Sequence, residues 1–262
     1  MTELSYGYIW WQFILLSLGS YLIGNVNFAV IISKLKKQDI RKVGSGNPGT
    51  LNMSRNFGMG IGILTLALDI LKGAIPTFIG GVLYKGYEFS GTNLPISMLT
   101  EVMCGFMAVL GHVFPVFMRF KGGKGIATTI GVFLVCNWQV ALISGAAAIV
   151  FILITEIGSM GSFIATTPGA IAACYSVYKK YIEAANMVSA TQIIVVAVSN
   201  LFIVSIIFLT WYAHRQNIKR LIAGEEHPTN WLQMIREAKI KHFRKKKALT
   251  EEKTDAAEKD EK

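Results

Sequence analysis

Charged residues are scarce in this chain. Asp, Glu, Lys and Arg make up only 16% of its 262 residues, whereas hydrophobic residues make up 52%. This composition argues against an ordinary soluble enzyme and is typical of an integral membrane protein.

Cysteine is also rare, and the three residues present, Cys104, Cys136 and Cys174, all lie inside apolar runs. An odd number without paired spacing argues against a disulfide framework and against a thiolate metal site.

Several catalytic signatures are missing as well. No group of His, Asp and Glu residues has metal-ligand spacing, no G-x-S-x-G nucleophile elbow occurs, and no histidine begins an H-x-x-x-x-D acyltransferase motif. The polar segments between the apolar runs also contain few carboxylates that could act as a general base. We therefore expect no metal and no cofactor, and we do not expect a hydrolase-type nucleophile.

Long apolar runs are abundant instead. About 20 apolar residues suffice for a helix to cross a bilayer. Runs of this kind predict spans at residues 8–33, 58–84, 97–119, 138–157, 160–178 and 189–213, with a shorter helix at 125–137. The sequence thus predicts an all-α, polytopic membrane helix bundle of about seven transmembrane helices.

The distribution of basic residues predicts the orientation of this bundle. Lys and Arg cluster after the first, third and last predicted spans: Lys34, Lys36, Lys37, Arg41, Lys42 and Arg55; Arg119, Lys121 and Lys124; Arg215, Lys219 and Arg220. By the positive-inside bias, these segments are cytoplasmic and the N-terminus is outside. A re-entrant rather than spanning helix at 125–137 would reverse everything downstream, and the basic tail argues against it.

Two regions of different character are expected. Residues 1–226 form an integral membrane domain, and residues 227–262 form a charged cytoplasmic C-terminal extension that is partly disordered. Within the extension, apolar residues recur at near-helical spacing above a basic run, Arg244 to Lys247, which favours either an amphipathic surface helix or a solvated tail: Trp231, Met234, Ile235 and Ile240. The net charge of +10 suits anionic lipid headgroups or phosphorylated substrates better than nucleic acid.

A basic, glycine-rich loop, Lys121-Gly122-Gly123-Lys124-Gly125, separates two apolar segments. Bare backbone amides, two ammonium groups and a following helix N-terminus all favour an anion. The loop is not the nucleotide P-loop, because no strand precedes it and the spacing differs. His112, in the preceding apolar run, is either a proton carrier or a packing residue.

Two further segments on the predicted cytoplasmic side contain residues suited to phosphate. The first runs from Gly44 to Arg55, and its candidate ligand-binding residues are Gly44, Ser45, Gly46, Asn47, Asn52 and Arg55. The other runs from His214 to Glu226. On a helix, His214, Asn217 and Leu221 share a face, whereas Arg220 lies elsewhere on the wheel. Each segment alone is also compatible with an ordinary turn or helix end.

Asp69 and Lys72 lie deep in the second predicted span, three residues apart. Charges inside a membrane are costly, so we expect this pair to face the bundle interior. Its role is open between a structural ion pair and a group that shapes the site.

The three phosphate-friendly segments together favour an enzyme acting on a phosphorylated metabolite and a lipid. The alternative is an organophosphate transporter, but a transporter is expected to place its charged site near the bilayer midplane between two related halves.

The three segments resemble the signatures of the bacterial membrane-integral glycerol-3-phosphate acyltransferases that use acyl phosphate as donor. The matching residues read G-S-G-N-P-G-T-L-N-M-S-R from Gly44, G-H-V-F-P-V-F-M-R-F-K-G-G-K-G from Gly111 and H-R-Q-N-I-K-R-L-I-A-G-E-E from His214. The D-x-x-K-G of Asp69 to Gly73 is also similar. The resemblance covers roughly residues 8–226. This chain departs from the family at Leu51, because the family usually reads G-A-T-N where this chain has Gly49-Thr50-Leu51-Asn52.

The resemblance implies a seven-span bundle and transfer of an acyl chain from acyl phosphate to the 1-hydroxyl of glycerol 3-phosphate, the first step of phospholipid synthesis. It also implies that acyl-CoA, acyl carrier protein and metal are not required. The expected location is the bacterial cytoplasmic membrane, with the active site on the cytoplasmic face and with a possible partner enzyme that supplies acyl phosphate.

The resemblance also implies roles for individual residues. Those expected to hold glycerol 3-phosphate and carry catalysis are Ser45, Arg55, Lys124, His214 and Asn217. The amides of Gly122, Gly123 and Gly125 are assigned to the acyl-phosphate group. The remaining substrate-binding candidates are Gly44, Gly46, Asn47, Asn52, His112, Lys121, Arg220 and Glu226. Deprotonation of the acceptor hydroxyl is open between a substrate phosphate oxygen and His214.

Overall fold

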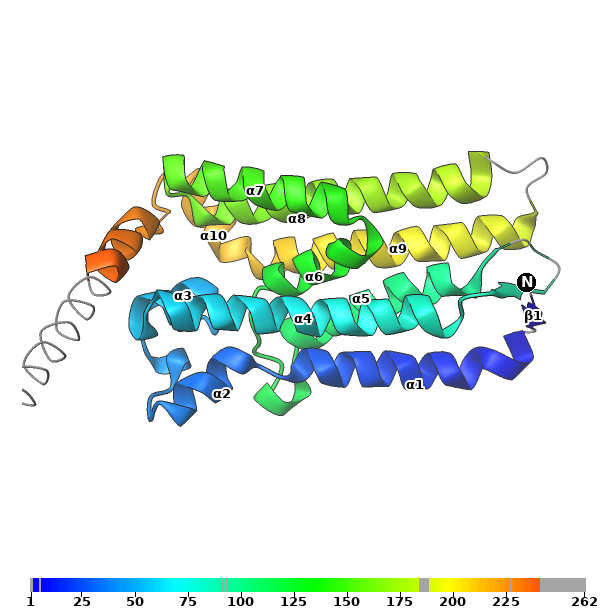
Figure 1. Ribbon diagram of the computed structural model, residues 1–262, viewed down its shortest axis with the longest axis horizontal. Coiled ribbons are helices and arrows are strands. Elements are labelled where there is room, and N and C mark those ends of the chain that lie inside the picture. The colour runs from blue at the N-terminus through cyan, green and yellow to red at the C-terminus, as the bar shows by residue number, and fades with distance from the viewer. Residues whose placement is uncertain are drawn as a thin grey trace, which may run out of the picture.

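Long helices lying side by side form most of the molecule (Figure 1). The computed structural model describes residues 2–4, 6–90, 92, 94–183, 189–226 and 228–240. The bundle contains α1 (Tyr6–Asn25), α4 (Met59–Leu83), α5 (Ile96–Val113), α7 (Trp138–Thr155), α8 (Gly158–Tyr178), α9 (Ala190–Ala213) and the shorter α6 (Ile126–Cys136). A bilayer core offers no water to unpaired backbone groups, so helices that pair these groups internally are favoured. The predicted all-α membrane bundle is confirmed.

Five stretches of the described chain are long and apolar enough to cross a membrane: Ile9–Leu35, Met59–Leu83, Ile96–Met118, Trp138–Thr155 and Ala190–Ala213. They correspond to five of the predicted spans. The predicted span at 160–178 is helical as α8, but it is rich in Gly, Ala, Ser and Thr and is not one of the five. The prediction of seven crossings with the N-terminus outside therefore stays a prediction.

Shorter elements cap the two ends of the bundle (Figure 1). At one end lie the short helices α2 (Phe28–Leu35), α3 (Thr50–Phe57) and α10 (Arg215–Ile222), with the 3-10 turns η1 (Ile40–Lys42) and η2 (Val116–Met118) in the connecting segments. Toward the other end, β1 (Thr2–Leu4) pairs in parallel with β2 (Tyr87–Phe89), and the π-helical turn η3 (Lys179–Glu183) follows α8. The sequence patterns did not predict the strands.

The predicted first span is broken into two helices. α1 ends at Asn25 and α2 begins at Phe28, where the Asn27 side chain accepts a hydrogen bond from the Val30 amide at 3.0 Å. The break leaves the Val26 carbonyl without a helical partner, and the Lys72 ammonium of α4 donates to it at 2.8 Å. Lys72 is held in turn by Asp69 at 2.9 Å, and both side chains are buried. The intramembrane pair therefore stabilises a helix break.

Small residues allow α4 and α6 to pack with their backbones in contact. A Cβ added at Gly73 of α4 would collide with the Thr128 carbonyl of α6, and one added at Gly131 of α6 would collide with the Ile70 carbonyl of α4. Such close packing is common between membrane helices, because lipid supplies no hydrophobic driving force between them. The contact fixes the start of α6, and with it the loop that precedes α6.

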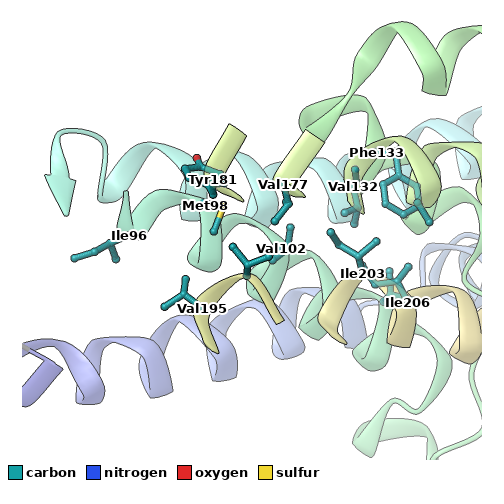
Figure 2. Packing of buried hydrophobic residues seen from close by; sticks show 14 of the residues in the cluster. Ile96, Met98, Val102, Val132, Phe133, Val177, Tyr181, Val195, Ile203 and Ile206 are labelled. Atoms are coloured by element: carbon teal, nitrogen blue, oxygen red, sulfur yellow. The ribbon is translucent and has the colours of Figure 1, made fainter. Parts of the chain in front are cut away.

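The protein core lies between α5, α6, α8 and α9. Figure 2 shows side chains from all four helices meeting there, and the residues it labels include Val102, Val132, Phe133, Val177, Ile203 and Ile206. Large apolar side chains also cover the outside of the bundle, with Ile143 71% and Ile154 78% exposed. On a soluble protein so much exposed apolar surface would favour aggregation, whereas lipid tails would cover it.

Part of the C-terminal extension is described. Residues 231–240 are helical, so the apolar residues Trp231, Met234 and Ile235 do recur on a helix. This helix extends from the end of the bundle that also contains α3 and α10 (Figure 1). Its placement on a membrane surface stays a prediction, and the basic run from Arg244 to Lys247 lies outside the described residues. The same is true of the predicted disorder in this region.

Candidate active site

The glycine-rich loop is clamped against the end of α5. The Gly122 amide donates to the Val113 carbonyl and the Gly123 amide to the His112 carbonyl, each at 3.2 Å. A Cβ added at Gly123 would collide with the His112 imidazole. Glycine is therefore required at this position because the loop backbone lies directly on a buried side chain.

These contacts refine the expected use of the loop amides. Two of the three amides assigned to an anion already donate to α5 carbonyls. Gly125 has a left-handed backbone with φ of 81° and forms the N-cap of α6, whose first residue is Ile126. The helix N-terminus remains a favourable place for an anion. The exposed Lys121 adds positive charge at the start of the loop. His112 is buried with its imidazole against Gly123, and its Nδ1 lacks a hydrogen-bond partner among the described residues.

Lys124 joins the loop to the segment after α9. Its ammonium donates to the Asn217 side-chain oxygen at 2.5 Å. The Asn217 amide nitrogen donates to Glu226 at 2.8 Å, and Arg220 reaches the other oxygen of Glu226 at 3.4 Å. Asn217 and Arg220 therefore lie on one side of α10. The prediction that Arg220 lies on another face of this helix than Asn217 was wrong, because residues three apart on a helix are neighbours.

Burial tunes the charges of this cluster. The partly buried Lys124 ammonium has its pKa lowered to about 8 by loss of solvent and by the nearby Arg220, although Glu226 opposes the shift. Burial raises the pKa of the Glu226 carboxyl, but hydrogen bonds from Asn217 and Arg220 outweigh burial and leave its pKa below the ordinary value. Near neutral pH, the cluster thus contains a charged Lys124 and an ionised Glu226.

His214 lies at the junction of α9 and α10, with its ring buried against Phe163. Its Nδ1 lies 2.8 Å from the Thr210 carbonyl, which selects the tautomer that is protonated at Nδ1 and leaves Nε2 as an acceptor. Burial and the Lys124 charge lower its pKa to about 4. His214 is therefore neutral at physiological pH and is a weak base.

Asn52 organises the first segment. Its side-chain oxygen accepts from the Ser45 amide at 3.2 Å, and its nitrogen donates to the Val43 carbonyl at 3.1 Å. A Cβ added at Gly44, whose φ is 57°, would collide with the Asn52 side chain. These contacts shape the loop that contains Gly46 and Asn47 and that exposes Ser45. The buried side-chain amide of Asn52, one turn before Arg55, is therefore needed to hold this loop.

Arg55 connects the first segment to the end of the third. Its Nη2 donates to the Pro228 carbonyl at 3.0 Å and to the Thr229 carbonyl at 3.2 Å. Side-chain contacts join Lys124, Asn217, Arg220 and Glu226 into one cluster. Arg55 contacts the residues that follow Glu226 in the chain. By contrast, the hydrogen bond that the Ser45 amide donates to Asn52 stays within the first segment. The sequence patterns missed Pro228 and Thr229, because backbone carbonyls leave no residue signature.

Comparison with known proteins identifies the architecture. A sequence profile described as glycerol-3-phosphate acyltransferase matches residues 14–224 of this chain. The chain belongs to this family. A glycerol-3-phosphate acyltransferase of Mycoplasmopsis pulmonis (strain UAB CTIP) is 35% identical over 218 residues, covering 82% of this chain and 92% of the relative. Glycerol-3-phosphate acyltransferase 2 of Thermotoga maritima (strain ATCC 43589 / DSM 3109 / JCM 10099 / NBRC 100826 / MSB8) is 35% identical over 222 residues, covering 84% and 97%.

Two solved structures share the fold of this acyltransferase. Both are of PlsY (YgiH), an integral membrane glycerol 3-phosphate acyltransferase. The glycerol 3-phosphate form has a TM-score of 0.66 at 31% identity, and the lysophosphatidic acid form has a TM-score of 0.63 at 30% identity. Each comparison covers 86% of this chain and 98% of the other. The resemblance seen in the sequence motifs is thereby confirmed.

Gly123→Ala is expected to impair the acyltransferase without unfolding it. The new Cβ must push the loop away from His112, which shifts Lys124 relative to Asn217. We expect kcat/KM to fall about tenfold or more, because a misplacement of about 1 Å in a site can be this costly. Gly60→Ala is the matched control, since Gly60 has open space around it. Equal kinetics for both variants would contradict this account of the loop.

The pH profile is expected to report Lys124. Because its pKa is about 8, the free enzyme loses this positive charge as the pH rises through 8, and kcat/KM for a phosphorylated substrate should fall there. Lys124→Arg keeps the charge at all accessible pH values and should remove this alkaline limb, even if overall activity drops. Steady-state kinetics from pH 6 to about 10 test this, and an unchanged limb in the arginine variant would assign it to another group.

Proposed function

We propose that this acyltransferase moves a fatty acyl group from acyl phosphate to the 1-hydroxyl of glycerol 3-phosphate. The products are 1-acyl-glycerol 3-phosphate (lysophosphatidic acid) and phosphate, and the reaction begins phospholipid synthesis. The observation that carries the proposal is the cation-containing cluster that links Lys124 to Asn217 at the end of the bundle where Arg55 also lies. The relatives named above, one of them solved with glycerol 3-phosphate, support the acceptor.

The chemistry asks little of a protein base. The acceptor hydroxyl oxygen attacks the acyl carbonyl carbon, the carbon–oxygen bond to phosphate breaks, and phosphate leaves with the bonding electron pair. Phosphate is a good leaving group, so orientation and charge neutralisation supply much of the rate. The pKa of about 4 makes His214 a poor proton acceptor at neutral pH. A phosphate oxygen therefore takes the hydroxyl proton, and His214 Nε2 accepts a hydrogen bond that orients the acceptor.

We assign the substrate-binding roles from the family resemblance and from where these residues lie. Arg55, Lys124 and Asn217 hold glycerol 3-phosphate together with Ser45, whose exposed hydroxyl is available to a ligand. The acyl-phosphate group lies at the N-terminus of α6, near Gly125 and Lys121. The acyl chain lies along the apolar outside of the bundle, in lipid. We assign the active site to the cytoplasmic face of a bacterial inner membrane, where a soluble enzyme can supply acyl phosphate, because Lys and Arg cluster in the segments that form it.

The direct test uses the purified full-length protein in detergent. Long-chain acyl phosphate and glycerol 3-phosphate should together yield lysophosphatidic acid and an equal amount of phosphate, and long-chain acyl-CoA should not replace the donor. Formation of lysophosphatidic acid from acyl-CoA in place of acyl phosphate would overturn the assignment of acyl phosphate as the donor. Movement of glycerol 3-phosphate across vesicles without release of phosphate from acyl phosphate would indicate the transporter instead.

A further inference from the structure

A short stretch after the family motifs, Pro228–Asn230, crosses the end of the bundle; we call it the strap. It follows Glu226, which is fixed by Asn217 and Arg220. The Thr229 amide donates to the Glu156 carbonyl, at the end of α7, at 2.9 Å. Thr229 is only 1% exposed. The strap is thus anchored at both sides, and it lies beyond residues 14–224, where the family profile matches.

The strap also contacts the side chain of Arg55. One guanidinium nitrogen, Nη2, donates to the carbonyls of Pro228 and Thr229 at 3.0 and 3.2 Å. Within the described part of the chain, the hydrogen bonds of this guanidinium are made by Nη2 and leave Nε and Nη1 without a protein acceptor. A free arginine side chain loses considerable rotamer freedom when it binds phosphate, and fixing it beforehand removes part of that cost.

We propose that the carbonyls of Pro228 and Thr229 position Arg55 for the phosphate of the acceptor substrate, so that Thr229 is a positioning residue for the acyl transfer. This inference rests on the proposed function, in which Arg55 binds glycerol 3-phosphate. The C-terminal extension is then part of the site at its first residues. Because the contact is made by the backbone, the identity of the side chains at 228 and 229 matters only through where they hold the strap.

Gly158, the first residue of α8, offers a way to move the strap. A Cβ at Gly158 would lie 2.8 Å from the Thr229 Cγ2 methyl and 3.4 Å from Leu51 Cδ1. Gly158→Ala must therefore shift the Thr229 methyl, and because Thr229 is buried we expect the strap backbone to move with it. Alanine itself suits a helix. Thr229→Ser removes the methyl that is struck and keeps the amide that donates to Glu156. The pair Gly158→Ala and Thr229→Ser should restore the strap. Gly145, with open space around it on α7, is the matched control.

The experiment measures kcat and KM for glycerol 3-phosphate in the full-length protein at saturating acyl phosphate. Gly158→Ala should raise KM about five- to tenfold, the effect of weakening one charge-assisted contact, with a smaller change in kcat. The double variant with Thr229→Ser should return KM toward the parent value, and Gly145→Ala should leave it unchanged. In an Arg55→Lys background, Gly158→Ala should have no further effect, because the strap acts through the guanidinium.

Three results would overturn the proposal. They are an unchanged KM in Gly158→Ala, a lowered KM (which would mean that the strap competes with substrate), or an equal effect with and without Arg55. Thr229→Pro, which removes the amide that binds Glu156, is the second route if Gly158→Ala does not fold. The shift in Tm caused by glycerol 3-phosphate replaces kinetics where Arg55→Lys has too little activity. Failure of the proposed function is distinct, because the parent itself would then form no lysophosphatidic acid.

Discussion

Replacing Arg55 by Ala is expected to lower kcat/KM for glycerol 3-phosphate about a hundredfold, mainly through KM. Arginine binds phosphate through charge-assisted hydrogen bonds, each of which contributes about 1.5–3 kcal/mol when the partner is charged. A loss of about 1.4 kcal/mol corresponds to a factor of ten. Arg55 is exposed, so its removal should not disturb the core. Initial rates of lysophosphatidic acid formation at varied glycerol 3-phosphate provide the measurement.

Arg41→Ala is the matched control for this experiment. Arg41 lies in the same connecting region, but its guanidinium is paired with Asp39 at 2.6 Å. Exposed ion pairs contribute little, so we expect kinetics close to those of the parent. If both variants lose activity equally, the general positive charge of this face is responsible, and Arg55 has no specific phosphate contact.

Replacing Lys72 by Ala is expected to destabilise the fold by about 3–5 kcal/mol. The change leaves the buried Asp69 carboxylate without its partner and the Val26 carbonyl at the break between α1 and α2 without its donor. Thermal unfolding in one detergent, compared with the parent, provides the measurement. Lys85→Ala is the control, because Lys85 is exposed beyond the end of α4 and its loss should cost no more than about 0.5 kcal/mol.

A double variant separates the two causes of this loss. Asp69→Leu combined with Lys72→Met removes both charges together, so the electrostatic part of the penalty should disappear. The unpaired Val26 carbonyl should remain, at about 1–3 kcal/mol. A double variant as unstable as Lys72→Ala alone would show that the unpaired carboxylate is not the main cause.

Much of the membrane architecture could be predicted from single segments. The span at 189–213 coincides closely with α9, and the short helix at 125–137 with α6, because long uncharged runs leave the backbone few alternatives to a helix in lipid. The break between α1 and α2 was not predictable in this way. Asn27 is an ordinary cap, and its importance depends on Lys72, which lies more than 40 residues away in the chain.

The sequence predicted that the three motif segments meet, and the structure shows direct contact between the second and the third. Lys124 of the second segment meets Asn217 and Glu226 of the third. Arg55 of the first segment contacts Pro228 and Thr229, which follow the third. The amides of Gly122 and Gly123, however, serve the packing of the loop on α5. Which donors are occupied by the protein itself depends on backbone geometry, and residue spacing carries no information about it.

The sequence by itself determined the membrane-embedded helical class, the family and the residue types that can hold phosphate, because these depend on local composition and on short motifs. Only the tertiary structure decided that Lys72 supports a broken helix, that His214 is held neutral by burial, and that Arg55 is fixed by the carbonyls of Pro228 and Thr229. These properties arise from solvent exclusion and from contacts between segments far apart in the chain. Neither cause can be read from one segment alone.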